Sequence, residues 1–273
     1  MSTATTASGT TAARSSGPQK KLVLWHVPVS NYSEKTRWAL DYKGLDYDRK
    51  TFRSGLHQVV LAIRGRGITV PVLDIEGRGH VSDSTDIIAA LEELQPEPSL
   101  YPGDEAQRRE ALELEDYFDD LGHDVRRVAM DEIFRDRKLA IHVFMSQVPR
   151  AAHALSPITF PLMVRPGVRR YYRVNDETVK EARRKVVAAF ELIDSRLEGG
   201  REHLVGDRFS VADLTAAALM YPLFVPPEFP YPTWDPATGP RGLREFRDSL
   251  KSHRAFEWGL EMYRRYRRPQ AGV

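Results

Sequence analysis

Residues 22–44 read LVLWHVPVSNYSEKTRWALDYKG, and this stretch decides the fold. Its first five residues are mainly apolar and favour a β-strand, which Pro28 ends because proline has no N–H for a strand ladder. From Tyr32 the pattern becomes helical, and Gly44 stands where a left-handed C-terminal cap is expected. The stretch therefore predicts a strand, a sharp loop and a helix. Ser30 lies in that loop, beside unpaired helix N–H groups whose positive potential suits an anion, including a thiolate.

The composition is ordinary for a globular protein and excludes some kinds of chemistry. Of the 273 residues, 41% are hydrophobic and 29% are charged, and 40 basic residues nearly balance 38 acidic ones. This balance gives no general reason to expect a nucleic acid or an anionic membrane as partner. The sequence contains no cysteine, so any sulfur chemistry must be brought by a ligand. The eight histidines show no paired spacing typical of metal ligands, and we expect no metal site.

Neither the N-terminus nor any apolar stretch has the pattern of a membrane or secretory segment. Residues 1–18 are rich in Ser, Thr, Ala and Gly and lack an apolar core, which predicts a disordered tail rather than a signal peptide. A Ser-rich tail is also a weak candidate for organelle targeting. The longest apolar stretch, residues 214–227, contains prolines and is too short to span a bilayer. We expect a cytoplasmic protein that makes no membrane contact.

Residues 19–94 predict a small α/β domain. After the first strand and helix, residues 45–52 favour a second strand and residues 56–64 a short helix. The β-branched run 68–74 is interrupted by Pro71. Proline is not expected inside a central strand, because it cannot donate to the ladder, unless it opens that strand. A cis peptide bond between Val70 and Pro71 would resolve the contradiction.

The remainder of this domain is predicted as a hairpin and a helix. Residues 76–79, Glu-Gly-Arg-Gly, read as a tight turn that leads into the strand 80–82. Asp83 and Ser84 then cap a helix over residues 85–94, whose apolar positions fit one face.

Residues 95–103 form a Pro-rich linker, and residues 104–273 carry almost only helix signals. We expect helices at 106–128, 136–147, 178–197, 242–252 and 255–268, with a Pro- and aromatic-rich loop at 222–240. Ser210 and Asp213 predict a capping box, which is a structural feature rather than a catalytic one. The run 264–268, RRYRR, is predicted to be a solvated face of the last helix rather than a nucleic-acid patch.

Taken together, these residues resemble the cytosolic glutathione S-transferase superfamily. Residues 27–37 look like its active-site loop and first helix, 69–73 like its cis-proline strand, and 83–87 like its glutamyl-recognition turn. Residues 209–213 are similar to the capping box of its helical domain. The resemblance covers about residues 20–265 and implies a thioredoxin-like domain followed by an all-helical domain. It also implies glutathione bound along the first domain, a hydrophobic electrophile between the two, and a homodimer.

The resemblance implies site residues as well. Ser30 matches the activating hydroxyl, and the expected glutathione-binding residues are Ser30, Thr69, Val70, Pro71, Asp83 and Ser84. In this scheme the Val70 backbone pairs with the cysteinyl part of glutathione, and cis-Pro71 shapes that contact. Asp83 and Ser84 hold the γ-glutamyl amino and carboxylate groups, in charge-assisted contacts. A hydroxyl that donates to sulfur favours the thiolate over the thiol, which agrees with the role of Ser30.

The sequence also departs from the family pattern near Ser30. Asn31 replaces a frequent proline, and the Ser at position 30 replaces the cysteine of reductase-type members, which argues against chemistry that needs a protein thiolate. His26, Tyr32 and Ser33 are backup catalytic donors. A histidine at a strand end is more often structural, and Ser33 is expected to cap the first helix.

Three functions follow from these residues and the resemblance. The first is a glutathione transferase of the Ser type, active in detoxification of hydrophobic electrophiles. The second is a transferase-like protein that binds hydrophobic ligands without turnover. The third is a related isomerase or ether-cleaving enzyme that uses glutathione or another small thiol. Variable side chains and loops build the second-substrate pocket, so the sequence leaves these alternatives open.

Overall fold

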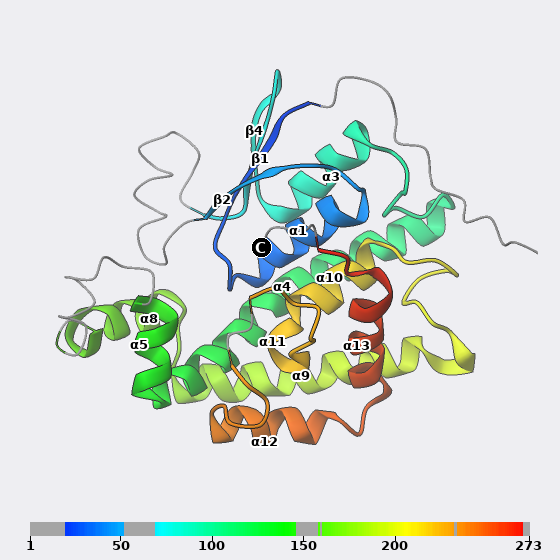
Figure 1. The fold of residues 1–273 in the computed structure, drawn as a ribbon. Helices are drawn as coiled ribbons and strands as arrows, with labels where there is room; N and C mark the ends of the chain where they lie inside the picture. The colour runs from blue at the N-terminus through cyan, green and yellow to red at the C-terminus, as the bar shows by residue number, and fades with distance from the viewer. Residues whose placement is uncertain (1–19, 52–68, 146–157, 159, 232–233, 270–273) are drawn as a thin grey trace, which may run out of the picture.

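The computed structural model describes residues 20–51, 69–145, 158, 160–231 and 234–269 of the chain (Figure 1). In chain order the elements are β1 (Leu22–His26), α1 (Asn31–Tyr42), β2 (Asp48–Thr51), β3 (Val72–Ile75), β4 (Gly79–Ser82), α3 (Ser84–Leu94), α4 (Glu105–Arg135), α5 (Arg137–Met145), the π-helix η1 (Phe160–Val164), α8 (Arg165–Tyr171), α9 (Asp176–Arg196), the 3₁₀-helix η2 (Glu198–Gly200), α10 (Val211–Leu219), α11 (Tyr221–Phe224), α12 (Arg241–Leu250) and α13 (Arg254–Tyr266). The α/β part thus precedes the helical part, as the sequence predicts.

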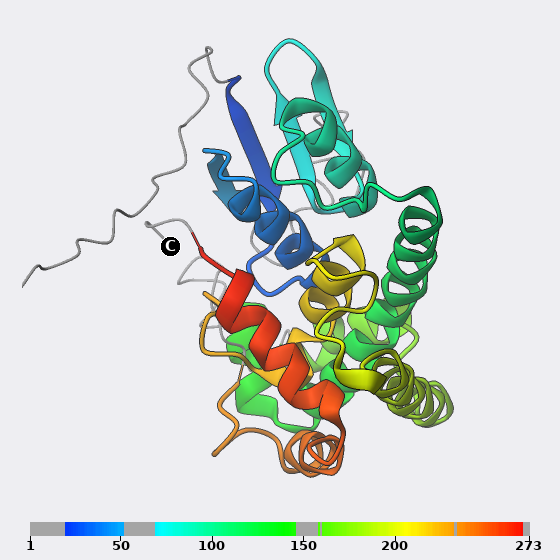
Figure 2. The ribbon, with the colours of Figure 1, turned by 90° about the vertical axis from the view of Figure 1, so that its right-hand side faces the viewer.

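The four strands form one sheet in the order β2-β1-β3-β4. β1 pairs parallel to β2 and antiparallel to β3, and β3 pairs antiparallel to β4. The helices α1 and α3 cover one face of this sheet, and α1 also lies against α10 and α4 of the helical part (Figures 1 and 2). This arrangement makes α1 the element through which the two parts meet.

The sequence locates the first strand, loop and helix within one or two residues. β1 alternates buried and partly buried positions, which fits its place inside the sheet. After α1 ends, Gly44 takes a φ of 66°, the left-handed conformation in which glycine carries no steric penalty. β2 begins at Asp48, three residues later than predicted, where its pairing with Val23 begins.

The peptide bond between Val70 and Pro71 is cis, as predicted, and β3 begins directly after it. The predicted turn at 76–79 joins β3 to β4. The predicted helix at 56–64 lies outside the described residues. In the linker, the Lys43 Nζ donates to the carbonyl oxygens of Gln95 (2.7 Å) and Pro98 (3.1 Å), which fastens the linker to the end of α1.

The helical part is built on α4, α9 and α10, which pack against one another. All nine residues of α10 are buried. The predicted capping box forms at its start, where the Asp213 carboxylate accepts from the Ser210 N–H at 2.9 Å. The other oxygen of this carboxylate accepts from the Leu204 N–H at 2.8 Å, a bond that the local pattern does not predict.

The C-terminal third corrects two predictions. The irregular loop was expected from residue 222, but α11 occupies Tyr221–Phe224, and α12 and α13 follow as predicted. The RRYRR run is a solvated face only in part. Arg264 and Arg265 are exposed, whereas Arg267 is 3% exposed because its guanidinium pairs with two carboxylates of α1.

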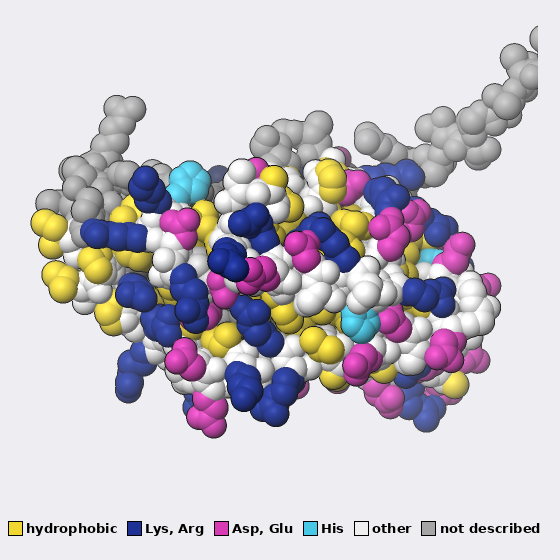
Figure 3. Space-filling model, turned by 90° about the horizontal axis from the view of Figure 1, so that it is seen from below, with side chains coloured by type: hydrophobic (Ala, Val, Ile, Leu, Met, Phe, Trp, Pro, Cys, Tyr) yellow, Lys and Arg dark blue, Asp and Glu magenta, His cyan; other side chains and the backbone are white. Residues whose placement is uncertain are grey.

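A small satellite core lies at the end of the molecule formed by α5 and α8. Ile133 and Phe134 of α4 pack there with Ala140 and Phe160, which explains why α4 runs beyond the predicted end at residue 128. Apolar side chains gather on the surface at this end, and elsewhere on this face basic and acidic side chains are interspersed (Figure 3). Among the described residues, no helix combines the length and hydropathy needed to cross a bilayer.

Candidate functional site

Ser30 lies at the mouth of β1 and is the N-cap of α1. Its backbone is extended, and its Oγ accepts from the Ser33 N–H at 3.3 Å. The expectation that Ser33 caps the helix is therefore wrong. Ser33 is instead fully buried in the first turn, and its Oγ lies 3.4 Å from the Val27 N–H. The cap falls on Ser30 because the helix begins at Asn31, one residue before the start at Tyr32 that the pattern suggests.

The sheet register brings three separate segments to the same end of the sheet. Trp25 pairs with Val72, so the cis Val70–Pro71 bond lies beside the loop that leaves β1. Val72 in turn pairs with Ser82, which places Asp83 next to this bond on the other side. α1 and α3 both begin at this end, because each follows directly on one of these segments.

Asp83 has a backbone conformation that non-glycine residues rarely adopt. Its φ is 78° and its ψ is 138°, although aspartate has no glycine-like freedom in this region. Residues held in such conformations cluster at functional sites. The Asp83 side chain is exposed and accepts from the Thr85 N–H at 2.9 Å, which caps α3. Ser84 follows as the first helical residue and is 2% exposed.

Thr69, Val70 and Pro71 present the backbone edge that opens β3. Thr69 is exposed, Val70 is partly buried and Pro71 is buried. Val70 packs with Val27 and Val72 in a small apolar cluster that lies under the loop carrying Ser30. The cluster fixes the two segments relative to each other, so that an extended ligand can meet the Val70 backbone and Ser30 together.

This end of the sheet is suited to an anion. The first N–H of each helix, at Asn31 and at Ser84, has no acceptor among the described residues, as expected at helix N-termini. Two helix dipoles add positive potential there. No group of three or more His, Asp or Glu side chains in the described part of the chain is arranged to hold a metal ion.

The structure places His26 inside the N-terminal part of the molecule. The His26 ring is 0% exposed, with its Nδ1 at 2.8 Å from Arg37 Nη1 and its Nε2 at 3.3 Å from Thr51 Oγ1. Because arginine only donates, Nδ1 is the acceptor and the proton lies on Nε2. Burial, together with Arg37 and then Arg49, lowers the pKa of His26 to about 3. Both ring nitrogens are therefore engaged within the protein.

Tyr32 faces the helical part rather than the end of the sheet. Its hydroxyl donates to the Asp119 carbonyl of α4 at 2.6 Å, and a Cβ on Gly122 would lie 3.0 Å from it. Burial raises the pKa of Tyr32 well above its ordinary value. Tyr32 thus ties the start of α1 to α4.

Two residues that the sequence did not single out hold the loop before Ser30. The Arg37 Nη2 donates to the Pro28 carbonyl at 3.0 Å, and the Tyr221 hydroxyl donates to the Val29 carbonyl at 2.7 Å. The Tyr221 contact joins residues 192 positions apart, so no local pattern could have found it. An arginine in a helix is expected to face solvent because of its charge, yet Arg37 is fully buried.

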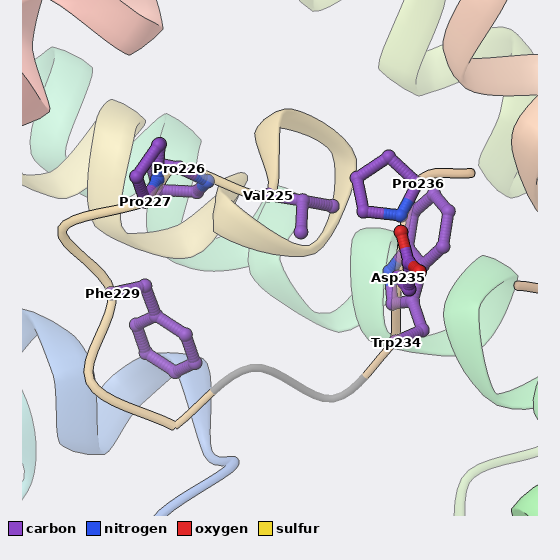
Figure 4. Close-up of a pocket in the computed structure, with 7 residues that line it drawn as sticks. All are labelled: Val225, Pro226, Pro227, Phe229, Trp234, Asp235 and Pro236. Carbon is purple, nitrogen blue, oxygen red and sulfur yellow. The ribbon is translucent and has the colours of Figure 1, made fainter. Parts of the chain in front are cut away.

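An apolar hollow of about 410 Å³ lies in the helical part near this loop (Figure 4). Its lining residues are Val225, Pro226, Pro227, Phe229, Trp234, Asp235 and Pro236. Figure 4 shows Phe229 on one side and Trp234 with Pro236 on the other. The Phe229 ring stacks on Tyr221 with 3.9 Å between centroids, and Tyr221 holds Val29. One aromatic layer therefore separates the hollow from the loop that carries Ser30.

Two family models match the chain. The model described as glutathione S-transferase, N-terminal domain, matches residues 24–99, and the model described as glutathione S-transferase, C-terminal domain, matches residues 151–232. The first match contains every segment of the site described above except the contacts from the helical part. Together the two matched segments make up more than half of the chain.

Individual relatives agree with these models. A glutathione S-transferase of Pseudomonas putida (strain F1) is 37% identical over 93 residues, which are 34% of this chain and only 41% of that protein. A glutathione S-transferase structure from Rhodospirillum rubrum F11 gives a TM-score of 0.52 at 24% identity and covers 92% of this chain and 96% of the other. The β-etherase LigF from Sphingobium sp. strain SYK-6 gives 0.56 at 23% identity, covering 88% and 98%.

Both structures lie below 25% identity and show the fold alone. The order of the elements supports the family given by the two models. The matched N-terminal segment contains the sheet, the cis-proline and α3, and the matched C-terminal segment falls in the helical part. The chain belongs to the cytosolic glutathione S-transferase superfamily, with a thioredoxin-like N-terminal domain followed by an all-helical C-terminal domain.

Proposed function

We propose that this protein is a glutathione transferase of the Ser type, which activates the glutathione thiol through Ser30 for attack on a hydrophobic electrophile. The observation that carries the proposal is the meeting of Ser30, the cis Val70–Pro71 bond and Asp83 at one end of the sheet. Each of the three supplies a different contact that a γ-glutamyl tripeptide with a central thiol requires.

Ser30 acts on the sulfur of glutathione. Its Oγ accepts from the Ser33 N–H, which leaves its own proton available to donate to a thiolate. The Asn31 N–H at the start of α1 adds a second donor. Both contacts stabilise the charged form and lower the thiol pKa, so more thiolate is present near neutral pH. The sulfur then forms a bond to the electrophilic carbon, the leaving group departs with its electron pair, and the thiol proton passes to solvent.

The remainder of glutathione lies along the thioredoxin-like domain. The Val70 backbone, with Thr69 before it and cis-Pro71 after it, pairs with the cysteinyl residue as an added strand would. The exposed Asp83 carboxylate holds the γ-glutamyl ammonium group. Ser84 at the start of α3 holds the γ-glutamyl carboxylate with its N–H and its hydroxyl.

Calorimetric titration with glutathione tests this assignment. We expect one saturable site, and weaker binding in Asp83→Asn, which keeps the cap of α3 but removes the charge, and in Ser84→Ala. Glu93→Gln is the matched control, because Glu93 lies at the other end of α3 and pairs with Arg78 at the surface. No heat of binding at millimolar glutathione would refute the proposal and direct attention to another ligand.

Two alternative functions would use the same site, and assays of thiol consumption distinguish them from the proposed transferase. A protein that binds hydrophobic ligands without catalysis would take up an apolar dye, near the hollow of Figure 4, and consume no thiol across a panel of electrophiles. Ether cleavage, which the name of the Sphingobium relative states for that protein, would need the same thiolate acting on an ether carbon. An aryl ether in the electrophile panel therefore tests it directly.

We further propose a cytoplasmic homodimer with a role in detoxification. Light scattering checks the assembly, and a mass equal to the 31.1 kDa of one chain would contradict it.

A further inference from the structure

Arg126 on α4 is a partly buried cation without a carboxylate partner among the described residues. Its neighbours differ in this respect. Arg127 pairs with Asp124, and Arg135 pairs with Asp131 at 2.9 Å. In the described part of the chain, the partner of Arg126 is the Nδ1 of His123, which lies 2.7 Å from Nη2, and Nε is buried without an acceptor there. A partly desolvated guanidinium with unused donors is costly unless an anion completes its contacts.

Two aromatic rings hold this guanidinium in place. Its Cζ lies 4.3 Å from the ring centroid of Tyr172 and 5.8 Å from that of Tyr32. Tyr172 is itself fixed, because the Arg127 Nε donates to its carbonyl at 3.2 Å. These contacts limit the motion of the guanidinium, and its Nη1 keeps charged donors for an anion.

Arg126 lies close to the thiol-activating loop. The Asn31 side chain, next to Ser30, donates to the Gly122 carbonyl of α4 at 3.0 Å. Gly122 and Arg126 are four residues apart and share one face of the helix, with a rise of about 6 Å between them. Tyr32, two residues after Ser30, touches both the helix and the guanidinium.

Among the described residues, no acidic side chain forms an ion pair with Arg126. Asp119, one turn before Gly122, is already paired with Lys35 at 2.7 Å and accepts from Thr85. His123 is held neutral, since burial and then Arg126 lower its pKa. The positive charge of Arg126 therefore remains available beside the place where the electrophile would approach the sulfur.

From this geometry we infer that Arg126 binds an anionic group of the second substrate, so that the preferred electrophiles carry a carboxylate or sulfonate besides their apolar body. The inference rests on the proposed function and adds a substrate class to it. Tyr32 and Tyr172 flank the guanidinium and contact the apolar body of the same molecule.

Matched electrophiles test the charge requirement. The anionic probe is 4-chloro-3,5-dinitrobenzoate and the neutral probe is its methyl ester. In both, glutathione sulfur forms a bond to the ring carbon, chloride leaves with the electron pair of the C–Cl bond, and the thiol proton passes to buffer. After correction for the uncatalysed rates, we expect kcat/KM for the carboxylate to exceed that for the ester about tenfold, as for a partly desolvated ion pair.

Variants assign this preference to one side chain. Arg126→Gln should abolish the preference, mainly through the KM of the carboxylate, while activity with the ester is kept. Arg126→Lys, which retains the charge, should keep part of the preference for the carboxylate. Arg109→Gln is the matched control, because Arg109 is an exposed arginine of the same helix. Equal handling of both probes by the wild type, or an unchanged preference in Arg126→Gln, would overturn the inference while leaving the proposed function intact.

A binding measurement keeps the inference testable without turnover. The unreactive 3,5-dinitrobenzoate and its uncharged amide are titrated into the wild type and Arg126→Gln. If neither chloro compound reacts, the proposed function fails, and tighter binding of the benzoate that is lost in Arg126→Gln still supports the anion site. Benzoate binding that is equal in both proteins refutes the site.

Discussion

In the proposed function, Ser30 performs two tasks with one hydroxyl. As N-cap of α1 it accepts a backbone N–H, and a hydroxyl that accepts can still donate its own proton. The same side chain can therefore stabilise the helix and a thiolate at once. Loss of the hydroxyl should therefore affect both the stability of the helix and the rate of the reaction, and these two effects can be measured separately.

Ser30→Ala should lower kcat at pH 7 roughly 10- to 100-fold, because one donor to the developing charge is lost. The thiol pKa rises in the variant, so its rate should approach that of the wild type at higher pH. Loss of the cap should cost about 1 kcal/mol of stability. A pH–rate profile and a thermal melt measure both effects.

Ser30→Thr is the control for this prediction, since threonine also caps helices and also donates. It should keep most of the activity and the pH profile of the wild type. Wild-type rates at pH 7 in Ser30→Ala would remove Ser30 from the mechanism.

His26 should make the stability of the protein sensitive to acid. Its pKa is about 3 in the folded protein against 6.5 in the unfolded chain, so the unfolded chain binds the proton more readily between these values. The free energy of unfolding should therefore fall as pH falls from about 6.5 toward 3, by up to about 1.4 kcal/mol per unit from this group. His26→Asn keeps an acceptor for Arg37 and should flatten that slope.

Denaturant unfolding at pH 4, 5, 6 and 7 measures the effect. His80→Asn serves as the matched control, because His80 is exposed. An equal slope in wild type and His26→Asn would show that His26 is not the group responsible.

At the scale of elements, the helices differ in how deeply their N-terminal caps are buried. α9 begins with Asn175 and Thr178 at the surface, whose side chains form a capping box. α10 begins with Ser210 and Asp213 inside the core, and Asp213 also fixes the Leu204 N–H. The capping box is therefore expected to contribute differently to stability in the two helices.

Asp213→Ala should destabilise the protein by about 2–4 kcal/mol, because two buried N–H groups lose their acceptor. Asn175→Ala should cost only about 1 kcal/mol, the usual value for an exposed cap. Equilibrium unfolding in urea compares the two variants. An equal loss of unfolding free energy in both variants would mean that burial does not determine how much the capping box stabilises the protein.

At the scale of the whole molecule, the end of α13 returns to the thioredoxin-like domain. Arg267 pairs with Glu34 at 2.6 Å and with Asp41 at 2.5 Å, and all three side chains are fully buried. Glu34 also pairs with Arg37 at 2.8 Å, which holds the Pro28 carbonyl. A continuous chain of charges thus links the C-terminal helix to the loop before Ser30.

Arg267→Ala should cost about 3–5 kcal/mol, because it leaves two buried carboxylates without their cation. The loss should shrink as pH falls, since burial already raises the pKa of Asp41, which can then take up a proton and lose its charge. Thermal melts at pH 5 and 7 test both statements. Arg268→Ala, an exposed neighbour, is the control, and equal melting temperatures of the two variants would contradict the prediction.

Local signals explain why so much of the fold was predictable. Pro71 in a β-branched run, Gly44 after a helical pattern, and the Ser210–Asp213 pair each act through residues a few positions away, and the structure confirms all three. The sequence assigns the cap of α1 to the wrong serine because both Ser30 and Ser33 satisfy the same capping rule, and only the backbone conformation distinguishes them. The order of the motifs sufficed for the family and for the proposed roles of Ser30, Val70 and Asp83.

The amino-acid sequence alone thus determined the elements, their order and the family, because those depend on short-range patterns of hydrogen bonding and hydrophobic periodicity. Only the tertiary structure decided which charges are buried together. Arg267 and Glu34 stand 233 positions apart, and the Tyr172 ring beside Arg126 comes from the turn that follows α8. From the sequence, a charged residue is expected to face solvent. Tertiary packing decides whether it forms a buried ion pair, as Arg267 does, or lies partly buried without a carboxylate partner among the described residues, as Arg126 does.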